Sequence, residues 1–421
     1  MAPPNLLPNL PPPPGTYTSL ALGTALGLTL AYLLRSPLFT SYPASSSLPG
    51  VIPAPSPPSP SSSVPHPYPP NVLPGRRPFR TPYGTINIYE FGSPTGEKVL
   101  FLPGIGTPVL ALGDMALRLA ETGGYRVMLF DLFGRGYSDC PTGVEFDGRL
   151  YAAQILMVLA SSDLSWTGSD GGFHLVGYSL GGGLAVDFAR YFGHLVRSLV
   201  VVANGGLVRR DRHVGWKSRV LYGRGWLPEW LLEWAVRRRI RPSKGGGPDE
   251  IEADHDVRGV GGKTDHDANG GKGWDSTLLS KRGESQMTVA DVMDWQVREH
   301  KGFVRAFRSS IRCAPIYDQG EEWREVRAML ELRRRREDKN VPGLRRGKVL
   351  MVLGRTDSVV VLEEVVEDAR RALGEDGVEV VVLEGGHEVA FTHGVEVADA
   401  AMRFWREDEG GVEEGGGGGG D

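Results

Sequence analysis

The chain has 421 residues, with 47 Lys and Arg against 51 Asp and Glu, a net charge of −4, 58 Gly, 31 Pro and two Cys. This length allows two or three domains or one large α/β domain, and the slightly acidic balance excludes a generally basic nucleic-acid-binding protein. Two cysteines exclude a disulfide framework and a cysteine-rich zinc site, and 9% aromatic residues are enough for a sizeable core, which excludes wholesale disorder.

The first segments of the chain are not typical of a globular domain. Residues 1–16 are rich in proline, and residues 17–34 form an apolar run without a charged side chain. As a helix this run would span about 27 Å, close to the hydrocarbon thickness of a bilayer. We therefore predict a single-pass membrane anchor over 17–34, with a cleaved signal peptide and a buried or surface helix as the alternatives.

Arginines follow this apolar run and none precedes it, which by the positive-inside tendency places the bulk of the protein on the cytosolic side. Residues 35–82 are rich in proline and serine, and this composition predicts a disordered, extended stalk. A second disordered segment is predicted over the glycine-rich residues 242–284, and residues 409–421 form a glycine-rich tail. A folded domain is therefore expected over 83–408, apart from the insert.

Apolar β-rich runs alternate with helical patterns in the folded part, which predicts an α/β fold with a mainly parallel sheet and helices on both faces. The alternating run at 84–91 is expected to be an antiparallel edge strand. Buried strands are predicted at 99–102, 126–130, 173–176, 198–202, 349–353 and 378–383. Helices are predicted at 108–121, 148–161, 180–193, 320–336, 359–373 and 389–407.

One motif lies where a predicted strand meets a predicted helix. Gly177, Ser179 and Gly181 form a G-x-S-x-G between the strand at 173–176 and the helix at 180–193. A sharp strand-to-helix turn brings its flanking residues close together, so glycine is needed at both ends. The turn also holds the serine hydroxyl above the sheet, at the positive end of the helix. Ser179 is therefore the predicted nucleophile.

A serine nucleophile needs a base, and the base needs an acid that orients it. His387 and Asp357 each follow one of the last two predicted strands, at the edge where open α/β sheets carry their sites. His174 lies within a strand and His393 on the closing helix, so both are weaker candidates for the base. An acid near Asn204 is the alternative position, but Asn-Gly-Gly stands there.

The negative oxygen that develops when a serine attacks a carbonyl needs two N–H donors aimed at it. One is expected to be the amide of Leu180, directly after the nucleophile. The other is expected from the loop after the strand at 99–102, where Gly104 permits a tight bend and Ile105 offers its amide. These two amides are the predicted oxyanion hole.

Five segments carry a resemblance to a known family. FLPGIGTP, MLFDLFGRGYSD, GYSLGGG, VLGRTD and EGGHE, in this order, resemble the α/β-hydrolase superfamily in its serine-hydrolase branch, over about 83–407. With the apolar N-terminal run and a cap, the chain also resembles membrane-anchored, monoacylglycerol-lipase-like members. The resemblance implies the α/β-hydrolase fold and a helical lid, here at about 205–318. Pro103 stands where the family has a histidine before Gly104.

The predicted lid begins with an aromatic and basic stretch. Trp216, Trp226, Trp230 and Trp234 are followed by the arginines of residues 237–241. Tryptophan and leucine beside a basic cluster suit a membrane interface, and a lid helix that packs its tryptophans onto the core is the alternative. Residues 288–308 are expected to be the return helix of the lid.

Together these features predict a membrane-anchored serine hydrolase that cleaves a carboxylic ester of an apolar substrate, such as a monoacylglycerol. The triad Ser179, Asp357 and His387 would act without an organic cofactor or a metal. The same triad could serve a peptidase, a thioesterase or an acyltransferase. From a different class, the chain could be a catalytically silent membrane scaffold that presents its proline-rich stalk. Asp131 is expected to be structural.

Overall fold

The computed structural model describes residues 50–57, 66–167, 172–215, 218, 221–222, 228–242, 274–280, 287–335, 343–344 and 347–406. The predicted anchor at 17–34, the segment before it, the tail at 409–421 and most of the predicted insert lie outside the described residues. Within the described part, no helix combines the length and the apolar character that a bilayer crossing requires.

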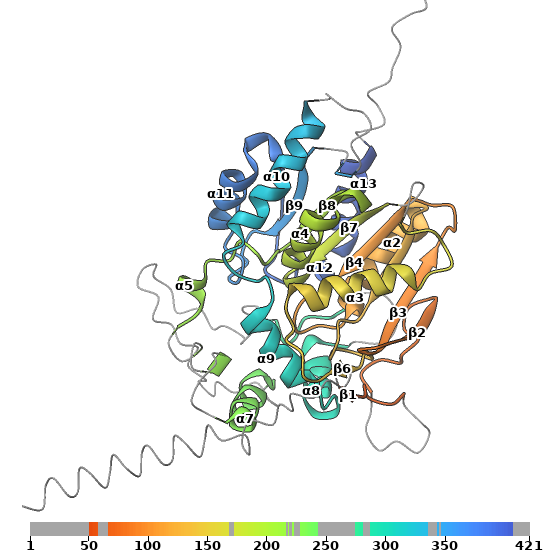
Figure 1. The fold of residues 1–421 in the computed structure, drawn as a ribbon, viewed down its shortest axis with the longest axis vertical. Coiled ribbons are helices and arrows are strands. Elements are labelled where there is room, and N and C mark those ends of the chain that lie inside the picture. Colours follow the sequence, from red (N-terminus) through yellow and green to blue (C-terminus); the bar gives the residue numbers. More distant parts are fainter. Residues whose placement is uncertain are drawn as a thin grey trace, which may run out of the picture.

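An eight-stranded sheet forms the centre of the molecule, in the order β10-β9-β8-β7-β4-β5-β3-β2 (Figure 1). All pairs from β10 to β5 are parallel, and β3 is antiparallel to both of its neighbours. The prediction of a mainly parallel sheet is therefore confirmed. The strands are β2 (Arg76–Thr81), β3 (Gly84–Gly92), β4 (Lys98–Leu102), β5 (Arg126–Phe130), β7 (Phe173–Tyr178), β8 (Val196–Val202), β9 (Val349–Gly354) and β10 (Val378–Leu383).

Successive side chains of a strand point to opposite faces, and here both faces are buried. In β4, for example, Val99 and Phe101 join one hydrophobic cluster while Leu100 and Leu102 join the other. The first cluster includes α2 (Gly113–Gly123), α12 (Val389–Thr392) and α13 (Gly394–Arg406). The second includes α3 (Gly148–Ala160), α4 (Leu180–Phe192), α10 (Gly320–Arg334) and α11 (Leu362–Leu373). Helices therefore cover both faces, as predicted.

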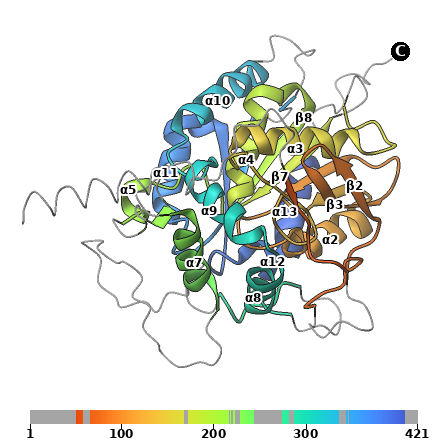
Figure 2. The ribbon, with the colours of Figure 1, turned by 60° about the horizontal axis from the view of Figure 1, so that its bottom comes forward.

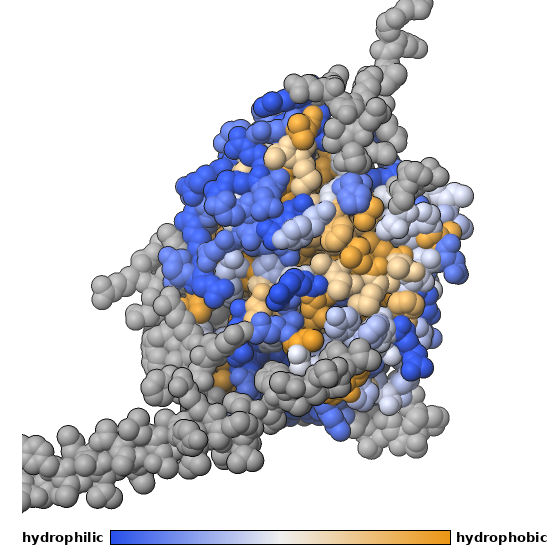
Figure 3. Space-filling model, viewed as in Figure 1, coloured by the Kyte–Doolittle hydropathy of each residue, from blue (hydrophilic) through white to orange (hydrophobic). Residues whose placement is uncertain are grey.

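The outer surfaces of α10 and α11 are strongly hydrophilic in the space-filling view (Figure 3). Arg and Glu on these helices form ion pairs along the chain, such as Arg327 with Glu331 and Arg371 with Glu367. Pairs of this kind at helical spacing keep one face of a helix solvated while the other face packs on the sheet.

We call the described residues between β8 and α10 the cap. It contains α5 (Arg210–His213), α7 (Glu229–Ile240), α8 (Val289–Glu299) and α9 (Phe303–Cys313). The helices α7, α8 and α9 contact one another. They lie together at the lower end of the molecule in Figure 1, the end that comes forward in Figure 2. An ion pair between Glu229 and the buried Arg308 connects α7 to α9.

The predicted disordered stalk over 35–82 is wrong for residues 66–82 and for β1 (Val51–Ile52), which pairs antiparallel with β6 (Cys140–Pro141). The strand β2 pairs with β3 along its whole length, and Tyr68 and Leu73 are almost fully buried. Proline does not exclude a strand at the edge of a sheet, where one side of the backbone needs no partner. β2 holds that edge position and contains Pro78.

The same pairing corrects a second prediction. The run at 84–91 was expected to be an edge strand, but β3 lies between β2 and β5. Its inner position explains why most of β3 is buried, including the polar Asn87 and Glu90. An alternating pattern fits an edge strand and also a strand whose polar residues bond within the fold.

The predicted disordered insert at 242–284 is wrong for residues 274–280. Trp274 is only 6% exposed, and Leu278 forms a bridge with Thr288 at the start of α8. The glycine-rich composition of the surrounding sequence hid this short ordered segment. Leu279 is fully buried as well, and backbone hydrogen bonds from Leu279 to Met287 and from Val289 to Thr277 tie the segment to the start of α8.

The predicted return helix at 288–308 is two helices. α8 begins with a capping box between Thr288 and Asp291, and it ends before His300. α9 starts after Gly302, where any side chain would collide with Cys140. The chain therefore turns at this close approach and does not continue as one helix. The predicted helix at 389–407 is likewise divided, into α12 and α13.

Candidate active site

The turn from β7 to α4 holds Ser179 in a strained backbone conformation, with φ of 52° and ψ of −120°. A side chain on Gly177 would collide with the carbonyl of Gly181, and one on Gly181 would collide with the carbonyl of Leu102. Glycine is thus required at both positions because strand, turn and helix approach so closely. Such a positive φ at a non-glycine residue is characteristic of functional turns that expose a side chain.

The structure brings the predicted base and acid to this serine. His387 Nε2 lies 2.9 Å from Ser179 Oγ, and His387 Nδ1 lies 2.9 Å from Asp357 Oδ2. The second carboxylate oxygen of Asp357 accepts the backbone amides of Val359 and Val360, both at 2.8 Å. Because both oxygens of the carboxylate are engaged, its plane is fixed relative to the imidazole.

The loop that carries His387 is held by hydrogen bonds on each side of the histidine. The amide of Thr356 donates to the carbonyl of Gly385 at 2.9 Å, and the carboxylate of Glu388 accepts the amide of Gly386 at 2.8 Å. The hydroxyl of Tyr178 donates to the carbonyl of His387 at 3.0 Å.

Burial holds the pKa of Tyr178 well above its usual value, and the charges of Asp357 and Glu388 act in the same direction. The phenol therefore stays protonated and remains a donor. Its bond to His387 connects the residue before the nucleophile to the loop that carries the base. This connection is a feature that the sequence analysis did not identify.

The loop after β4 lies directly against the nucleophile. A side chain on Gly104 would come within 3.5 Å of the Ser179 Cβ. Within the described residues, the amides of Ile105 and Leu180 donate to no protein acceptor. The two predicted oxyanion donors are thus near Ser179 and available, and Leu180 lies at the N-terminal end of α4, where the helix dipole is positive.

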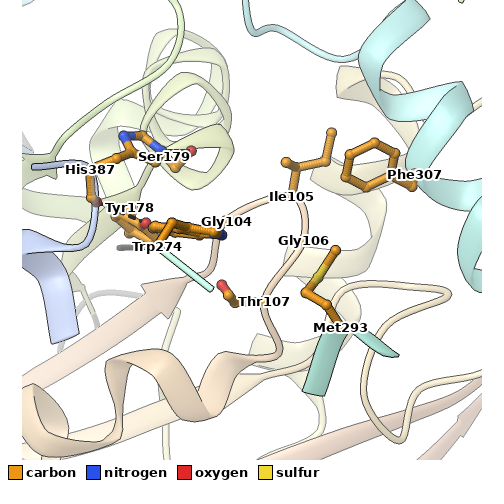
Figure 4. A pocket seen from close by; sticks show the side chains of 10 residues that line it. All are labelled: Gly104, Ile105, Gly106, Thr107, Tyr178, Ser179, Trp274, Met293, Phe307 and His387. Atoms are coloured by element: carbon orange, nitrogen blue, oxygen red, sulfur yellow. Dashed lines mark hydrogen bonds between the residues drawn. The ribbon is translucent and has the colours of Figure 1, made fainter. Parts of the chain in front are cut away.

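A small pocket joins these groups (Figure 4), with a cavity volume of about 30 Å³. Ser179 and His387 each follow a strand of the sheet. Met293 and Phe307 belong to the cap helices α8 and α9, and Trp274 belongs to the cap segment 274–280, which precedes α8. The Trp274 ring packs against the imidazole of His387, with 5.7 Å between ring centroids. The remaining lining residues are Gly104, Ile105, Gly106, Thr107 and Tyr178.

Two of these lining residues, Trp274 and Thr107, are not indicated by any sequence pattern. Met293 and Phe307 belong to the predicted return segment 288–308, whose apolar residues are expected either to line an acyl pocket or to pack only in the core, and the fold directs these two into the pocket. Thr107 is 3% exposed, and its hydroxyl has no hydrogen-bond partner in the part of the chain that the structure describes. A buried hydroxyl without a partner is costly unless a ligand or a water supplies one.

The rival candidates for the base and the acid lie elsewhere. His174 is bonded to Ser198 and Glu97 at the opposite end of β7, and His393 bonds to Thr392. Asn204 is buried after β8 and donates to the carbonyl of Gly205. None of these three side chains lines the pocket that contains Ser179.

Asp131, which the sequence analysis took as structural, is buried after β5. It accepts hydrogen bonds from the amides of Val109 and Tyr137 and from the side chain of Asn87. Burial raises its pKa, while these hydrogen bonds oppose the rise. Among the described residues, no group of three or more His, Cys, Asp or Glu side chains is arranged to hold a metal ion.

The doubly wound sheet and the serine at a strained strand-to-helix turn define a protein of the α/β-hydrolase class. The sequence model of the "Alpha/beta hydrolase family" matches residues 99–400, and the chain belongs to this family. The match spans the sheet from β4 onward, the cap and the last helices.

Similarity to individual proteins is more limited. An uncharacterized protein of Mycobacterium tuberculosis (strain ATCC 25618 / H37Rv) is 30% identical over 139 residues, which is 33% of this chain and 38% of that protein. A 2-hydroxy-6-oxo-2,4-heptadienoate hydrolase of Pseudomonas putida is 29% identical over 29% of this chain and 41% of its own length. The alignment thus spans less than half of these relatives.

Among solved structures, a bacterial membrane phospholipase A has a TM-score of 0.52 at 17% identity, covering 93% of this chain and 99% of that chain. A carboxylesterase from Bacillus subtilis has a TM-score of 0.50 at 14% identity, covering 80% of this chain and 92% of that chain. At these identities the likeness concerns the fold alone.

Proposed function

We propose that the protein is a serine hydrolase that cleaves a carboxylic ester of an apolar substrate through an acyl-enzyme on Ser179. The observation that carries this proposal is the chain of hydrogen bonds from Asp357 through His387 to Ser179, with 2.9 Å at each step. The serine stands on the strained turn that the family uses for a nucleophile. Membership of a hydrolase family agrees with this assignment.

In the proposed reaction, Ser179 Oγ attacks the ester carbonyl while His387 Nε2 accepts its proton. Asp357 keeps the proton of His387 on Nδ1 and stabilises the imidazolium that forms. The amides of Ile105 and Leu180 bind the negative oxygen of the tetrahedral intermediate. His387 then protonates the leaving alcohol, and a water molecule activated by the same imidazole releases the acid and frees Ser179.

The pocket lining supports an apolar acyl group. Ile105, Trp274, Met293 and Phe307 surround the space next to Ser179. Its volume of about 30 Å³ holds about two water molecules, at about 10–15 Å³ for each. A longer acyl chain therefore requires the side chains of the cap to move apart. A monoacylglycerol or a similar lipid ester is our proposed substrate.

Membrane association is part of this proposal. Residues 17–34 would anchor the chain in a bilayer, with the catalytic domain on the cytosolic side. The second contact would be α7, where Trp230 and Trp234 are 67% and 56% exposed one helical turn apart. Arg238 lies near the Trp234 ring at 6.0 Å, and Arg241 follows the helix. Exposed tryptophan beside arginine suits an interface that contains anionic lipid.

The test is labelling of the full-length, membrane-extracted protein with a fluorophosphonate probe. We expect the wild type to be labelled and both Ser179→Ala and His387→Ala to be unlabelled, while all three remain folded by circular dichroism. A well-folded wild type that is not labelled would contradict the proposal and favour a silent scaffold.

Product analysis then separates the reactions open to the same triad. Esters of graded acyl length, peptides, thioesters and 2-hydroxy-6-oxo-2,4-heptadienoate, which the relative from Pseudomonas putida is named for, form the substrate panel. Addition of a competing alcohol distinguishes hydrolysis from acyl transfer. We expect apolar carboxylic esters to give the highest kcat/KM, with the free acid as the product.

A further inference from the structure

Two buried side chains hold the loop that supplies the proposed oxyanion donor, and they come from different parts of the fold. Arg135, in the loop after β5, donates from Nε to the carbonyl of Ile105 at 3.1 Å. Gln296, on the cap helix α8, donates from Nε2 to the next carbonyl, that of Gly106, at 2.9 Å. Consecutive peptide groups of this loop are therefore fixed from the sheet side and from the cap.

Arg135 is 1% exposed and surrounded by neutral acceptors. Besides Ile105, its guanidinium donates to the carbonyl of Phe133, the hydroxyl of Tyr151 and the hydroxyl of Ser310, at 2.8, 3.1 and 2.8 Å. No carboxylate lies within ion-pair distance of it in the described ranges of the chain. A buried charge without a counter-charge is costly, so the site retains a positive charge at the expense of stability.

That charge lies where it favours the proposed chemistry. It is within hydrogen-bond distance of Ile105, whose amide faces the developing negative oxygen in our proposal. A fixed positive charge in a water-poor site stabilises a nearby negative charge more strongly than it would in water. The same guanidinium also determines the direction of the Ile105 carbonyl, and thus the orientation of the loop.

Gln296 makes the loop geometry depend on the cap. It is fully buried, and its Oε1 accepts the amide of Gly136 at 2.9 Å while its Nε2 holds Gly106. Around it the cap packs closely on the loop, because a side chain on Gly106 would lie 3.3 Å from the sulfur of Met293. A displacement of α8 would therefore release the Gly106 carbonyl.

We propose that Arg135 and Gln296 are positioning residues that aim the amide of Ile105 at the transition state, so that the oxyanion hole is complete only while α8 lies against the loop. This inference rests on the proposed function, since it assumes acyl chemistry at Ser179. Neither side chain lines the pocket, so both act through the loop and not through contact with the substrate.

The chain contains a matched control for Gln296. Gln154 is also fully buried and also bridges two backbone groups with its amide, accepting from Phe133 at 3.2 Å and donating to Asp131 at 3.1 Å. Within the described residues, neither of these hydrogen bonds reaches the loop at 104–107. Replacing either glutamine by leucine removes the acceptor of one buried amide and one donor to a buried carbonyl. The Asp131 carbonyl keeps the hydroxyl of Ser138 at 2.8 Å, and the cost in stability of the two variants should be of the same order.

The experiment compares wild type, Ser179→Ala, Gln296→Leu, Gln154→Leu and Arg135→Lys as full-length proteins. For each, kcat and KM are measured with p-nitrophenyl butyrate, and the inhibition constant is measured for a trifluoromethyl ketone, which forms a tetrahedral adduct with an oxyanion. Urea unfolding reports the stability of each variant.

We expect Gln296→Leu to lower kcat about 10–100-fold with little change in KM. The inhibition constant of the trifluoromethyl ketone should rise by a similar factor. Arg135→Lys keeps the positive charge but loses the several N–H donors of the planar guanidinium. We therefore expect a smaller loss of kcat, again with little change in KM and weaker binding of the ketone. Gln154→Leu should keep the wild-type kcat despite a comparable loss in urea resistance.

Equal losses of kcat in Gln296→Leu and Gln154→Leu, or an unchanged inhibition constant in Gln296→Leu, would overturn the inference while leaving the proposed function intact. A wild type that matches Ser179→Ala, with no turnover and no labelling, would instead overturn the proposed function. The two failures are therefore distinguishable.

Discussion

The sheet and the cap form opposite sides of one pocket, but they are built in different ways. On the sheet side, Ser179, Asp357 and His387 each follow a strand and are fixed by short hydrogen bonds. On the cap side, Met293 and Phe307 contribute apolar surface and no acid–base group. In the proposed function, the acid–base groups therefore stand on the sheet, and the cap contributes apolar lining to the pocket.

The largest expected effect breaks the sheet side. Asp357→Asn should lower kcat about 10⁴-fold with little change in KM, because an amide next to His387 Nδ1 favours the tautomer that cannot accept the serine proton. Steady-state kinetics on a water-soluble ester measure it. The volume-conserving cap variant Met293→Leu is the control, and we expect it to change kcat less than about tenfold. A comparable loss in both variants would contradict the division between sheet and cap.

Two tryptophans, one in the core beside the sheet and one in the cap, test whether the sheet and the cap have different roles. Trp166 is 1% exposed in the hydrophobic cluster on the α3 and α4 side of the sheet and bonds to Glu90, so Trp166→Ala should reduce the free energy of unfolding by about 3–5 kcal/mol. Trp274→Ala should instead widen the pocket and raise the relative rate on longer acyl esters. Urea unfolding and an ester series of increasing chain length measure both effects. A shift in chain-length preference in Trp166→Ala would argue against the comparison.

The junction between α8 and α9 gives a pH-dependent prediction. Burial lowers the pKa of His300 to about 4, and its hydrogen bond to the carbonyl of Ser138 opposes this shift. The folded protein therefore keeps His300 neutral where an unfolded chain, with a pKa of about 6.5, binds a proton. Stability from this group is present above pH 6.5 and is lost as the pH falls towards 4.

From this difference we expect about 2 kcal/mol of the unfolding free energy to disappear between pH 7 and 4.5. In His300→Asn this part of the loss should be absent, which urea unfolding at a series of pH values will show. Equal pH dependence in the variant and the wild type would indicate that His300 does not titrate differently in the two states.

The smallest effect concerns the exposed face of α7. In vesicles that contain brominated phosphatidylserine, the quenching of tryptophan fluorescence should be largely lost in Trp230→Phe/Trp234→Phe, since these two are the exposed tryptophans among the cap residues that the structure describes. Trp166→Phe, which alters a buried tryptophan, should keep the quenching. Unchanged quenching in the double variant would show that α7 does not touch the lipid, with kcat on a soluble ester unaffected in either case.

The sequence alone predicted most of the sheet and placed Ser179, Asp357 and His387, because buried strands appear as short apolar runs and the residues that follow them must meet at one edge. It could not predict that residues 66–82 are ordered, because their composition is rich in proline although Tyr68 and Leu73 are buried in the fold. Nor could it identify the buried Trp274 and Leu279 within a glycine-rich stretch, since two anchoring side chains in a short segment leave no periodic pattern.

The contacts of Arg135 and Gln296 are also features that the sequence could not predict, for a different reason. Each side chain bonds to loop carbonyls far away in sequence, with separations of 30 residues for Ile105 and 190 residues for Gly106. No local pattern encodes a partner at such a distance. In sequence, Arg135 is one residue of a turn and Gln296 one polar position of a helix, and only the fold brings both side chains to the same loop.

The proposed catalytic groups lie far apart in sequence, so the order in which the chain folds determines when they come together. Ser179 and His387 are separated by 208 residues, and the whole cap, β9 and β10 lie between them. Closing such a long loop is slow, because the contacts between parallel strands offset its entropy cost only after the intervening elements have folded. A partly folded chain therefore presents a serine without its base, so esterase activity should appear last in refolding, after most of the native fluorescence has returned.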